Sequence, residues 1–187
     1  LSDSLEKGEI ALSGYYDKYK KYWCRNIINE LNIRGIILES ANKDSGEDLG
    51  IYLTGNIDKI EILDNSLNVN VVDYKTGVPK SRNEIEGKTK NSEGEYKRQL
   101  VFYKILLDAY DNGKYKMASG EIDFIEPDSK GNYKKEKFFI EDNDVLDLKD
   151  TIRNVAKEIF DLSFWDKRCD DKKCEYCKLR EMMTKNH

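Results

Sequence analysis

Apolar and polar residues alternate most clearly over residues 69–75, near the middle of the chain. Successive side chains of a strand point to opposite faces of a sheet, so residues two apart share a face. One face of this strand carries Val69, Val71, Asp73 and Lys75. The Gly-Val-Pro sequence at residues 77–79 ends the strand shortly after Lys75. The pattern therefore predicts a strand whose buried face runs from two valines into an acid and an amine.

A second alternating segment, residues 51–63, contains Asp58. The Asp-Asn-Ser sequence at residues 64–66 is typical of a tight turn, which folds this segment antiparallel onto residues 69–75. That pairing brings Asp58 toward Asp73. Three further strands are expected at residues 35–40, 120–126 and 134–140, and a hairpin loop at residues 42–50.

Apolar residues recur at intervals of three and four in other segments, as in amphipathic helices. These segments are residues 1–34, 96–110 and 145–162. Asp142 or Asn143 is the expected N-cap of the last helix, which is expected to cover one face of the sheet. Gln99 and Tyr103 stand four residues apart and so share one face of the middle helix. The predicted fold class is α/β, with a mixed central sheet and helices on both faces.

The composition is that of a folded, soluble domain. Charged residues make up 36% and aromatic residues 11% of the 187 residues, and the chain has only two prolines, which excludes a disordered class. No apolar run reaches the length of a membrane span, and no signal peptide precedes Leu1. We therefore expect a single cytoplasmic domain without a membrane partner.

The net charge of −4 by itself argues against a nucleic-acid partner. The local distribution differs, because residues 75–98 hold seven basic side chains against four acidic ones. A second basic group in the tail comprises Lys167, Arg168, Lys172, Lys173, Lys178 and Arg180. Basic patches attract phosphate backbones, and a solvated lysine-rich surface explains each of these residues equally well.

Two carboxylates and a lysine that meet at one place suit metal-dependent attack on phosphorus. Mg²⁺ takes carboxylate oxygens and keeps several waters, and an amine beside it can hold or deprotonate one of those waters. An acid and a lysine two positions apart are common on surface strands, so Asp73 and Lys75 alone are a weak signal. Asp58 supplies the second carboxylate that this chemistry needs.

Three ordered motifs lie around these residues. They are residues 53–58 (Leu-Thr-Gly-Asn-Ile-Asp), 72–77 (Val-Asp-Tyr-Lys-Thr-Gly) and 99–103 (Gln-Leu-Val-Phe-Tyr). They resemble the G-x-x-D, D-x-K-T-G and Q-L-x-x-Y motifs of RecB-type nucleases in the PD-(D/E)XK superfamily. Such nucleases usually sit at the C-terminal end of DNA helicases or in helicase–nuclease complexes. The resemblance covers residues 35–111.

The resemblance implies a restriction-endonuclease-like fold in one domain, residues 1–187, with a short cysteine-containing tail. Residues 1–34 would form a leading helical segment, residues 35–140 the catalytic sheet and the Gln99 helix, and residues 141–187 the covering helix and the tail. The implied activity is hydrolysis of DNA phosphodiesters with Mg²⁺ or Mn²⁺, by exonuclease more than endonuclease action. The implied partners are DNA and a helicase domain in the same chain or complex, in DNA recombination and repair. The alternative is a catalytically inactive DNA-binding or docking module derived from such a nuclease.

The resemblance also implies roles for individual residues. The implied metal ligands are Asp58, Asp73 and the backbone carbonyl of Tyr74. Lys75 would orient or activate water, with Gln99 and Tyr103 in support. Glu39 is a candidate for an outer position at this site. The polar segment 76–95 would be a long loop that closes over DNA or is mobile without function.

Three of the four cysteines lie in the tail, spaced as Cys169-x4-Cys174-x2-Cys177, and the fourth is Cys24. In a cytosolic protein such spacing favours a metal centre over a disulfide. The resemblance implies an iron–sulfur cluster held by an upstream cysteine and a final C-x2-C-x5-C group. Here the expected last ligand falls at Met183, so Cys169 would replace it and Cys24 would be the fourth ligand. Zinc takes the same soft ligands, and an empty remnant of the site is the third alternative.

Related enzymes often carry a metal-ligating histidine on a helix well upstream of the G-x-x-D strand. The sole histidine of this chain is His187. The chain is therefore interpreted as a fragment of a longer protein, or as one whose site works without that ligand.

Overall fold

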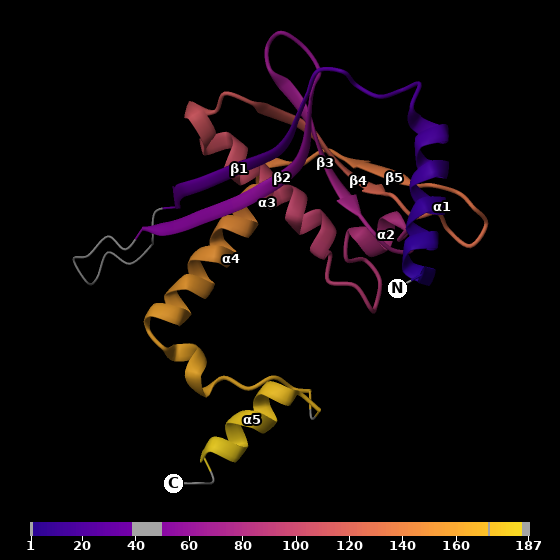
Figure 1. The fold of residues 1–187 in the computed structure, drawn as a ribbon. Coiled ribbons are helices and arrows are strands. Elements are labelled where there is room, and N and C mark those ends of the chain that lie inside the picture. Colours follow the sequence, from indigo (N-terminus) through magenta and orange to yellow (C-terminus); the bar gives the residue numbers. More distant parts are fainter. Residues whose placement is uncertain (1, 39–49, 172, 185–187) are drawn as a thin grey trace.

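The computed structural model describes residues 2–38, 50–171 and 173–184. Within them the strands form one sheet in the order β1-β2-β3-β4-β5 (Figure 1). The strands are β1 (Ile27–Leu38), β2 (Ile51–Ile62), β3 (Asn68–Lys75), β4 (Lys116–Phe124) and β5 (Lys135–Phe138). Neighbouring strands are antiparallel except β3 and β4, which are parallel. The predicted mixed sheet is confirmed.

Five α-helices and two short 3-10 helices accompany the sheet in the described part of the chain. They are α1 (Ser2–Tyr19), α2 (Arg82–Ile85), α3 (Glu95–Ala109), η1 (Tyr110–Asn112), α4 (Asp142–Phe160), η2 (Ser163–Asp166) and α5 (Glu175–Thr184). Parallel strands need a long crossover connection, and α3 lies within the one that joins β3 to β4. Figure 1 shows α4 leading away from the sheet toward α5. None of these helices is long and apolar enough to cross a membrane.

The hydrophobic core lies between α3 and the sheet. Its fully buried residues include Val69 and Val71 of β3 and Leu100, Leu106 and Leu107 of α3. A glycine in β2 lets α3 come close, because a Cβ atom on Gly55 would lie 2.5 Å from Cδ1 of Leu106. Removal of this apolar surface from water holds α3 against the sheet, so the polar residues of α3 reach the end of β3.

The opposite face of the sheet carries a buried polar network. Asp123 of β4 is fully buried; the Tyr15 hydroxyl of α1 donates a hydrogen bond to its Oδ2, and Nζ of Lys135 lies 2.6 Å from the same oxygen. Burial raises the pKa of Tyr15, and the hydrogen bond to Asp123 raises it further. This network attaches α1 to β4 and β5, so helices lie on both faces of the sheet as predicted.

The prediction of one helix over residues 1–34 is wrong in its second half. α1 ends at Tyr19, and strand β1 begins at Ile27. Isoleucines 27, 28 and 33 of β1 are β-branched, which favours a strand, and pairing with β2 satisfies their backbone groups. That pairing is a contact between distant parts of the chain, so the spacing of apolar residues does not reveal it.

The other predicted strands are present with different bounds. The short strand expected at residues 35–40 is the end of the longer β1, and β4 begins before the predicted Gly120, at Lys116. β1 and β2 pair as a hairpin, as predicted. Glu39 and residues 42–49 of the expected hairpin loop lie outside the described residues.

The polar segment 76–95 is not a loop throughout, because it contains the short helix α2. Ser81 and Glu84 form a capping box: the Ser81 side chain accepts a hydrogen bond from the backbone N–H of Glu84, and the Glu84 carboxylate accepts one from the N–H of Ser81. Ile85 is 1% exposed and packs into the core. The middle of segment 76–95 is thus attached to the core of the domain.

Helix α4 also differs from its prediction. Its N-cap is Glu141, one residue before the predicted Asp142 or Asn143. It packs mainly against α3 rather than directly on the sheet, since α3 already covers that face. Val145 near its start is buried, whereas Ile159 near its end is exposed. The apolar stripe of α4 therefore continues beyond its contact with α3.

We expect Leu106→Ala to lower the free energy of unfolding by about 2–5 kcal/mol, because it leaves a cavity between α3 and β2. Urea denaturation measures this change. The matched control is Leu146→Ala on α4, where the side chain is exposed and the expected change is within about 0.5 kcal/mol. Equal losses in the two variants would contradict the position of α3.

Candidate active site

Asp73 and Lys75 lie at the carboxyl end of β3, where the buried valines give way to polar side chains. Asp73 is 1% exposed. Nζ of Lys75 lies 2.7 Å from Oδ2 of Asp73, which places both side chains on the same face of the strand, as the alternation predicts. The local fold therefore holds a carboxylate at the edge of the core with an ammonium group beside it.

Asp58 joins them from the neighbouring strand. Its Oδ2 accepts a hydrogen bond of 2.9 Å from the backbone N–H of Tyr74. The turn between β2 and β3 sets this register, because Oδ1 of Asp64 accepts hydrogen bonds from the backbone N–H groups of Ser66 and Asn68. The charge of Asp58 contributes to a raised pKa of Asp73. The two carboxylates thus meet at one site rather than on opposite sides of the sheet.

Helix α3 completes the site with Gln99 and Tyr103, which stand one turn apart. The Tyr103 hydroxyl donates a hydrogen bond of 3.0 Å to Oδ1 of Asp73. Nε2 of Gln99 donates to the Tyr103 hydroxyl at 2.7 Å. Nζ of Lys75 donates to Oε1 of Gln99 at 2.7 Å. Together with the contact between Lys75 and Asp73 these bonds form a closed ring of four side chains, called here the polar cycle.

The charge state of Asp73 is set by opposing effects. Burial raises its pKa above the ordinary range, and the nearby Asp58 carboxylate adds to that rise. The hydrogen bond and charge of Lys75 and the Tyr103 hydroxyl act in the other direction. The pKa of Tyr103 is itself raised, mainly by burial and then by the Asp73 charge. The cycle therefore offsets only part of the cost of burying the Asp73 carboxylate.

One oxygen of this carboxylate suits a cation. Oδ2 of Asp73 is buried and has no hydrogen bond of regular geometry, although Nζ of Lys75 is its close ion-pair partner. Asp58 brings a second carboxylate next to it, and Tyr74, whose backbone carbonyl is the third predicted ligand, directly follows Asp73 in the chain. Carboxylate and carbonyl oxygens are the ligands that Mg²⁺ and Mn²⁺ prefer, so the residues present fit such an ion.

Sequence reasoning missed Tyr96, which contacts the site, and Lys59, which contacts the Tyr74 ring on the other face of the strand. Nζ of Lys75 lies 4.8 Å from the centre of the Tyr96 ring at the start of α3. Nζ of Lys59, which is buried on the other face, lies 5.2 Å from the Tyr74 ring. The spacing of three residues from Tyr96 to Gln99 places them on one helix face and was the available signal. No comparable sequence signal pointed to Lys59, because a lysine within a strand is normally solvated.

The tail holds a separate group of three cysteines. The Sγ atoms of Cys169, Cys174 and Cys177 all lie within 4.8 Å of one another. The pKa of the Cys174 thiol is lowered by a hydrogen bond from the Cys177 backbone and by Cys169, while hydrogen bonds to the other two thiols raise the pKa of Cys169 to about 11. Cys24 is not in this group, and its thiol lies 3.5 Å from the backbone oxygen of Asn26.

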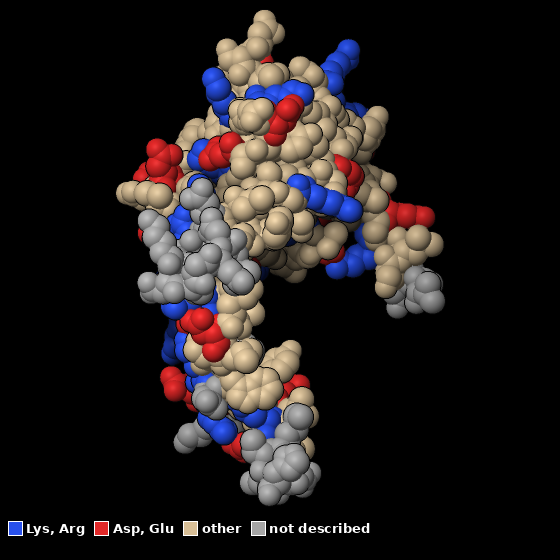
Figure 2. Space-filling model, turned by 90° about the vertical axis from the view of Figure 1, so that its left-hand side faces the viewer, with Lys and Arg blue, Asp and Glu red and all other residues tan. Residues whose placement is uncertain are grey.

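Acidic neighbours pair most of the predicted basic side chains. Lys80 pairs with Glu95, Arg82 with Glu86 and Glu136, Lys88 with Glu86, and Lys97 with Asp144. In the tail, Lys167 pairs with Glu158 and Arg168 with Glu181. Figure 2 shows basic and acidic side chains intermixed on the face it presents. On that face Lys and Arg side chains do not form one continuous positive surface.

Comparisons with known proteins found one family model and solved structures that are similar to this chain. A family model described as the PD-(D/E)XK nuclease superfamily matches residues 6–182. A similar solved structure is that of a candidate exonuclease from Eubacterium rectale, with a TM-score of 0.50, 10% identity, and coverage of 92% of this chain and 59% of that one. At this identity the likeness shows the fold, and the chain spans little more than half the length of that protein. No curated protein matches the chain.

We expect Asp73→Asn to change how stability depends on pH in metal-free protein. The folded-state pKa of Asp73 is raised, so its contribution to stability is present below the unfolded-state pKa of about 3.9 and is lost as pH rises through the folded-state pKa. Relative to Asp73→Asn, the free energy of unfolding of the wild type should therefore fall by up to about 1.4 kcal/mol per pH unit between the unfolded-state and folded-state pKa values. Above the folded-state pKa the difference should stay constant. Urea denaturation in a chelator at a series of pH values measures the difference.

The control for this experiment is Asp128→Asn. Relative to this variant, the stability of the wild type should rise with pH instead of falling. Hydrogen bonds from the backbone N–H groups of Asn132 and Lys130 lower the pKa of Asp128, so its contribution is present at neutral pH and is lost as pH falls through the folded-state pKa. A wild type that gains stability over Asp73→Asn as pH rises would contradict the raised pKa of Asp73.

Proposed function

This chain belongs to the PD-(D/E)XK nuclease superfamily, and from that premise we propose that it hydrolyses DNA phosphodiester bonds with the help of Mg²⁺ or Mn²⁺. The observation that carries the proposal is the polar cycle of Asp73, Lys75, Gln99 and Tyr103, with Asp58 beside it. The five residues come from three separated segments of the sequence. Their convergence at the edge of the core supports the interpretation as a catalytic site and not as an ordinary charged surface patch.

The proposed ligands of the metal ion are the carboxylates of Asp58 and Asp73 and the carbonyl oxygen of Tyr74. The ion supplies positive charge where negative charge develops on the phosphate oxygens. Tyr103 holds Oδ1 of Asp73, so Oδ2, which the Lys75 ammonium contacts, is the oxygen proposed to bind the ion. Tyr74 holds Oδ2 of Asp58 through its backbone N–H. Each carboxylate is thereby fixed before the ion binds, which reduces the reorganisation that binding requires.

Lys75 is proposed to orient the attacking water and to assist its deprotonation. Its ammonium group is held between the carboxylate of Asp73 and the amide oxygen of Gln99, so it has little freedom to turn toward solvent. The Tyr96 ring covers it at 4.8 Å. A donor fixed in this way can hold a water molecule in line with the phosphorus–oxygen bond that breaks.

Gln99 and Tyr103 are proposed as positioning residues. Gln99 bonds to Lys75 through its oxygen and to Tyr103 through its nitrogen, so it fixes both neighbours at once. Tyr103 transmits that order to Asp73. Movement of α3 relative to β3 would disturb all four side chains together, which ties the proposed activity to the packing of this helix.

Exonuclease action in a recombination or repair protein with a helicase is the finer part of the proposal. It rests on the resemblance to RecB-type motifs and on the description of the Eubacterium rectale protein as a candidate exonuclease. Digestion of linear DNA with no cutting of closed circular DNA supports exonuclease action. Linearisation of the circle would establish endonuclease action instead.

We also propose that Cys169, Cys174 and Cys177 hold a thiophilic metal centre in the tail, either zinc or an iron–sulfur cluster. The three Sγ atoms already lie within 4.8 Å of one another. The lowered pKa of Cys174 favours the thiolate form that binds such metals. Both kinds of centre usually take a fourth ligand, and Cys24, the ligand predicted from the sequence, is not among the gathered thiols.

Lys75→Ala should reduce the rate of DNA cleavage by about 10²- to 10⁴-fold, because it removes the group that positions and activates water. Asp73→Ala should abolish cleavage, because it removes a metal ligand. The rates are measured on linear single-stranded and double-stranded DNA with Mn²⁺, and circular dichroism checks that each variant is folded.

The matched control for this measurement is Lys114→Ala, which removes an exposed lysine that follows η1. Its rate should equal that of the wild type. Mn²⁺ should raise the melting temperature of the wild type but not of Asp73→Ala, since only a protein that binds the ion is stabilised by it. A folded wild type that binds DNA without cutting it would favour the docking-module alternative.

Cys174→Ser should lower the metal content of the purified protein, while Cys24→Ser should leave it unchanged. The reason is that Cys174 is one of the three gathered thiols and Cys24 is not. Elemental analysis after anaerobic purification measures zinc and iron, and visible absorbance identifies a cluster. Metal-free wild-type protein, or equal loss in both variants, would overturn the proposed centre.

A further inference from the structure

A mostly apolar groove of about 330 Å³ opens beside Gln99, between α3, α4 and β2. Its walls include Leu53, Arg98, Gln99, Phe102, Leu148 and Ile152. The volume lies near the lower end of the range of small-molecule sites, about 300–1,000 Å³. Gln99 lines this groove and also belongs to the polar cycle, so the groove lies next to the proposed site of hydrolysis.

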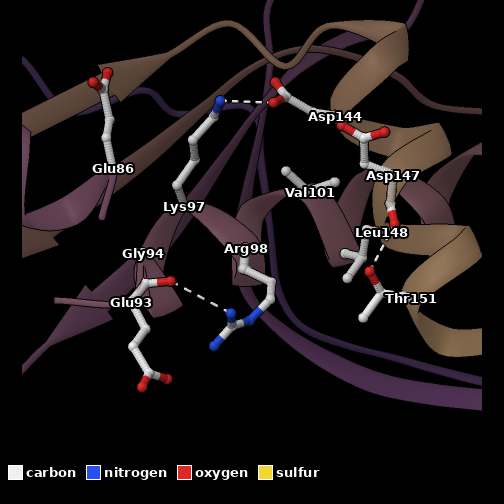
Figure 3. Close-up of a pocket in the computed structure, with 10 residues that line it drawn as sticks. All are labelled: Glu86, Glu93, Gly94, Lys97, Arg98, Val101, Asp144, Asp147, Leu148 and Thr151. Carbon is white, nitrogen blue, oxygen red and sulfur yellow. Dashed lines mark hydrogen bonds and ion pairs between the residues drawn. The ribbon is translucent and has the colours of Figure 1, made fainter. Parts of the chain in front are cut away.

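A second hollow of about 290 Å³ lies on the other side of Arg98 and differs in character (Figure 3). Its lining includes the carboxylates of Glu86, Glu93, Asp144 and Asp147. In Figure 3, Lys97 points to Asp144, with which it pairs at 2.8 Å. The lining holds four acids against two bases, Lys97 and Arg98, so the hollow is a poorer path for a polyanion than a groove without excess negative charge. The apolar groove is the one that suits part of the substrate.

Phe102 gives the apolar groove a fixed aromatic platform. Its ring is partly buried against the core, and a Cβ atom on Gly55 would lie 3.5 Å from its Cε1. The backbone of β2 therefore supports the ring from one side. An aromatic side chain already held in place loses little entropy when a flat ligand stacks on it.

Arg98 supplies charge next to this platform. Its side chain is exposed, and among the described residues its guanidinium makes one long hydrogen bond, of 3.4 Å, to the backbone oxygen of Glu93. Glu95, the one acid among the described residues that line the groove, is paired with Lys80 at 2.6 Å. A ligand with an apolar, flat part and a neighbouring anion matches this arrangement, and a nucleotide has both.

We infer that the groove binds the base of an unpaired nucleotide adjacent to the reacting phosphodiester, with Phe102 stacking on the base and Arg98 contacting its phosphate. This inference rests on the proposed nuclease function. A base inside a duplex has both faces covered by its neighbours, so only an unpaired base reaches Phe102. The substrate of the site is therefore a single strand or an unpaired end.

Equilibrium binding in a chelator tests the groove without cleavage. The probes are a short fluorescein-labelled single-stranded oligonucleotide and the same strand with abasic nucleotides, followed by fluorescence anisotropy. The wild type should bind the base-bearing strand about tenfold more tightly, because one stacked base is lost in the abasic strand. Phe102→Leu should lose that preference, and Phe102→Trp should keep it.

The matched control is Phe139→Leu, an identical change at an exposed phenylalanine directly after β5, and it should keep the preference. Arg98→Gln should weaken binding of both strands and reduce the slope of log affinity against log salt by about 0.7. Lys130→Gln, in the turn between β4 and β5, should not change the slope. A wild type with equal affinity for both strands, or a Phe102→Leu variant that keeps the preference, would overturn the inference.

Cleavage separates this inference from the proposed function. With Mn²⁺, the wild type should cut the base-bearing strand with a lower KM than the abasic strand, and Phe102→Leu should raise the KM for the base-bearing strand alone. Cleavage of both strands at equal KM would overturn the base site and leave the nuclease proposal standing. Base-dependent binding without any cleavage would overturn the nuclease proposal.

Discussion

The structure depends on burying the carboxylate of Asp73 at the end of a strand whose preceding residues are apolar. A buried charge is costly unless it is paired and hydrogen-bonded. Here Lys75 pairs with one oxygen and Tyr103 bonds to the other. Asp58 adds a like charge and raises the pKa further. The negative charge buried at the site is thus only partly compensated, and a bound cation would compensate more of it. Burial of apolar side chains elsewhere in the fold must offset the remaining cost.

That burial comes from the same helix that carries the polar side chains. Leu100, Leu106 and Leu107 of α3 are fully buried, whereas Gln99 and Tyr103 project from its first turns to the end of β3. Because α3 joins the parallel strands β3 and β4, its position also fixes the sheet. On the opposite face, the buried network of Tyr15, Asp123 and Lys135 holds α1 against the sheet. One helix therefore couples core packing to the geometry of the site.

The parts of the site that local patterns determine could be predicted from the sequence. Alternation places Asp73 and Lys75 on one face, and helical spacing does the same for Gln99 and Tyr103. The resemblance to known motifs then suggested that the two pairs meet. The predictions that failed depend on contacts between distant segments. Residues 27–34 are a strand because they pair with β2, which no local pattern encodes.

The charge of the molecule bears on how it would recognise a nucleic acid. With a net charge of −4 and most described basic residues of segment 75–98 in ion pairs, long-range attraction contributes little. Affinity must then come from close contacts at the site, such as stacking on Phe102 and the guanidinium of Arg98. Contacts of that kind need a strand that is already unpaired. The proposed helicase partner would supply such a strand, and weak electrostatic capture is physically consistent with that proposal.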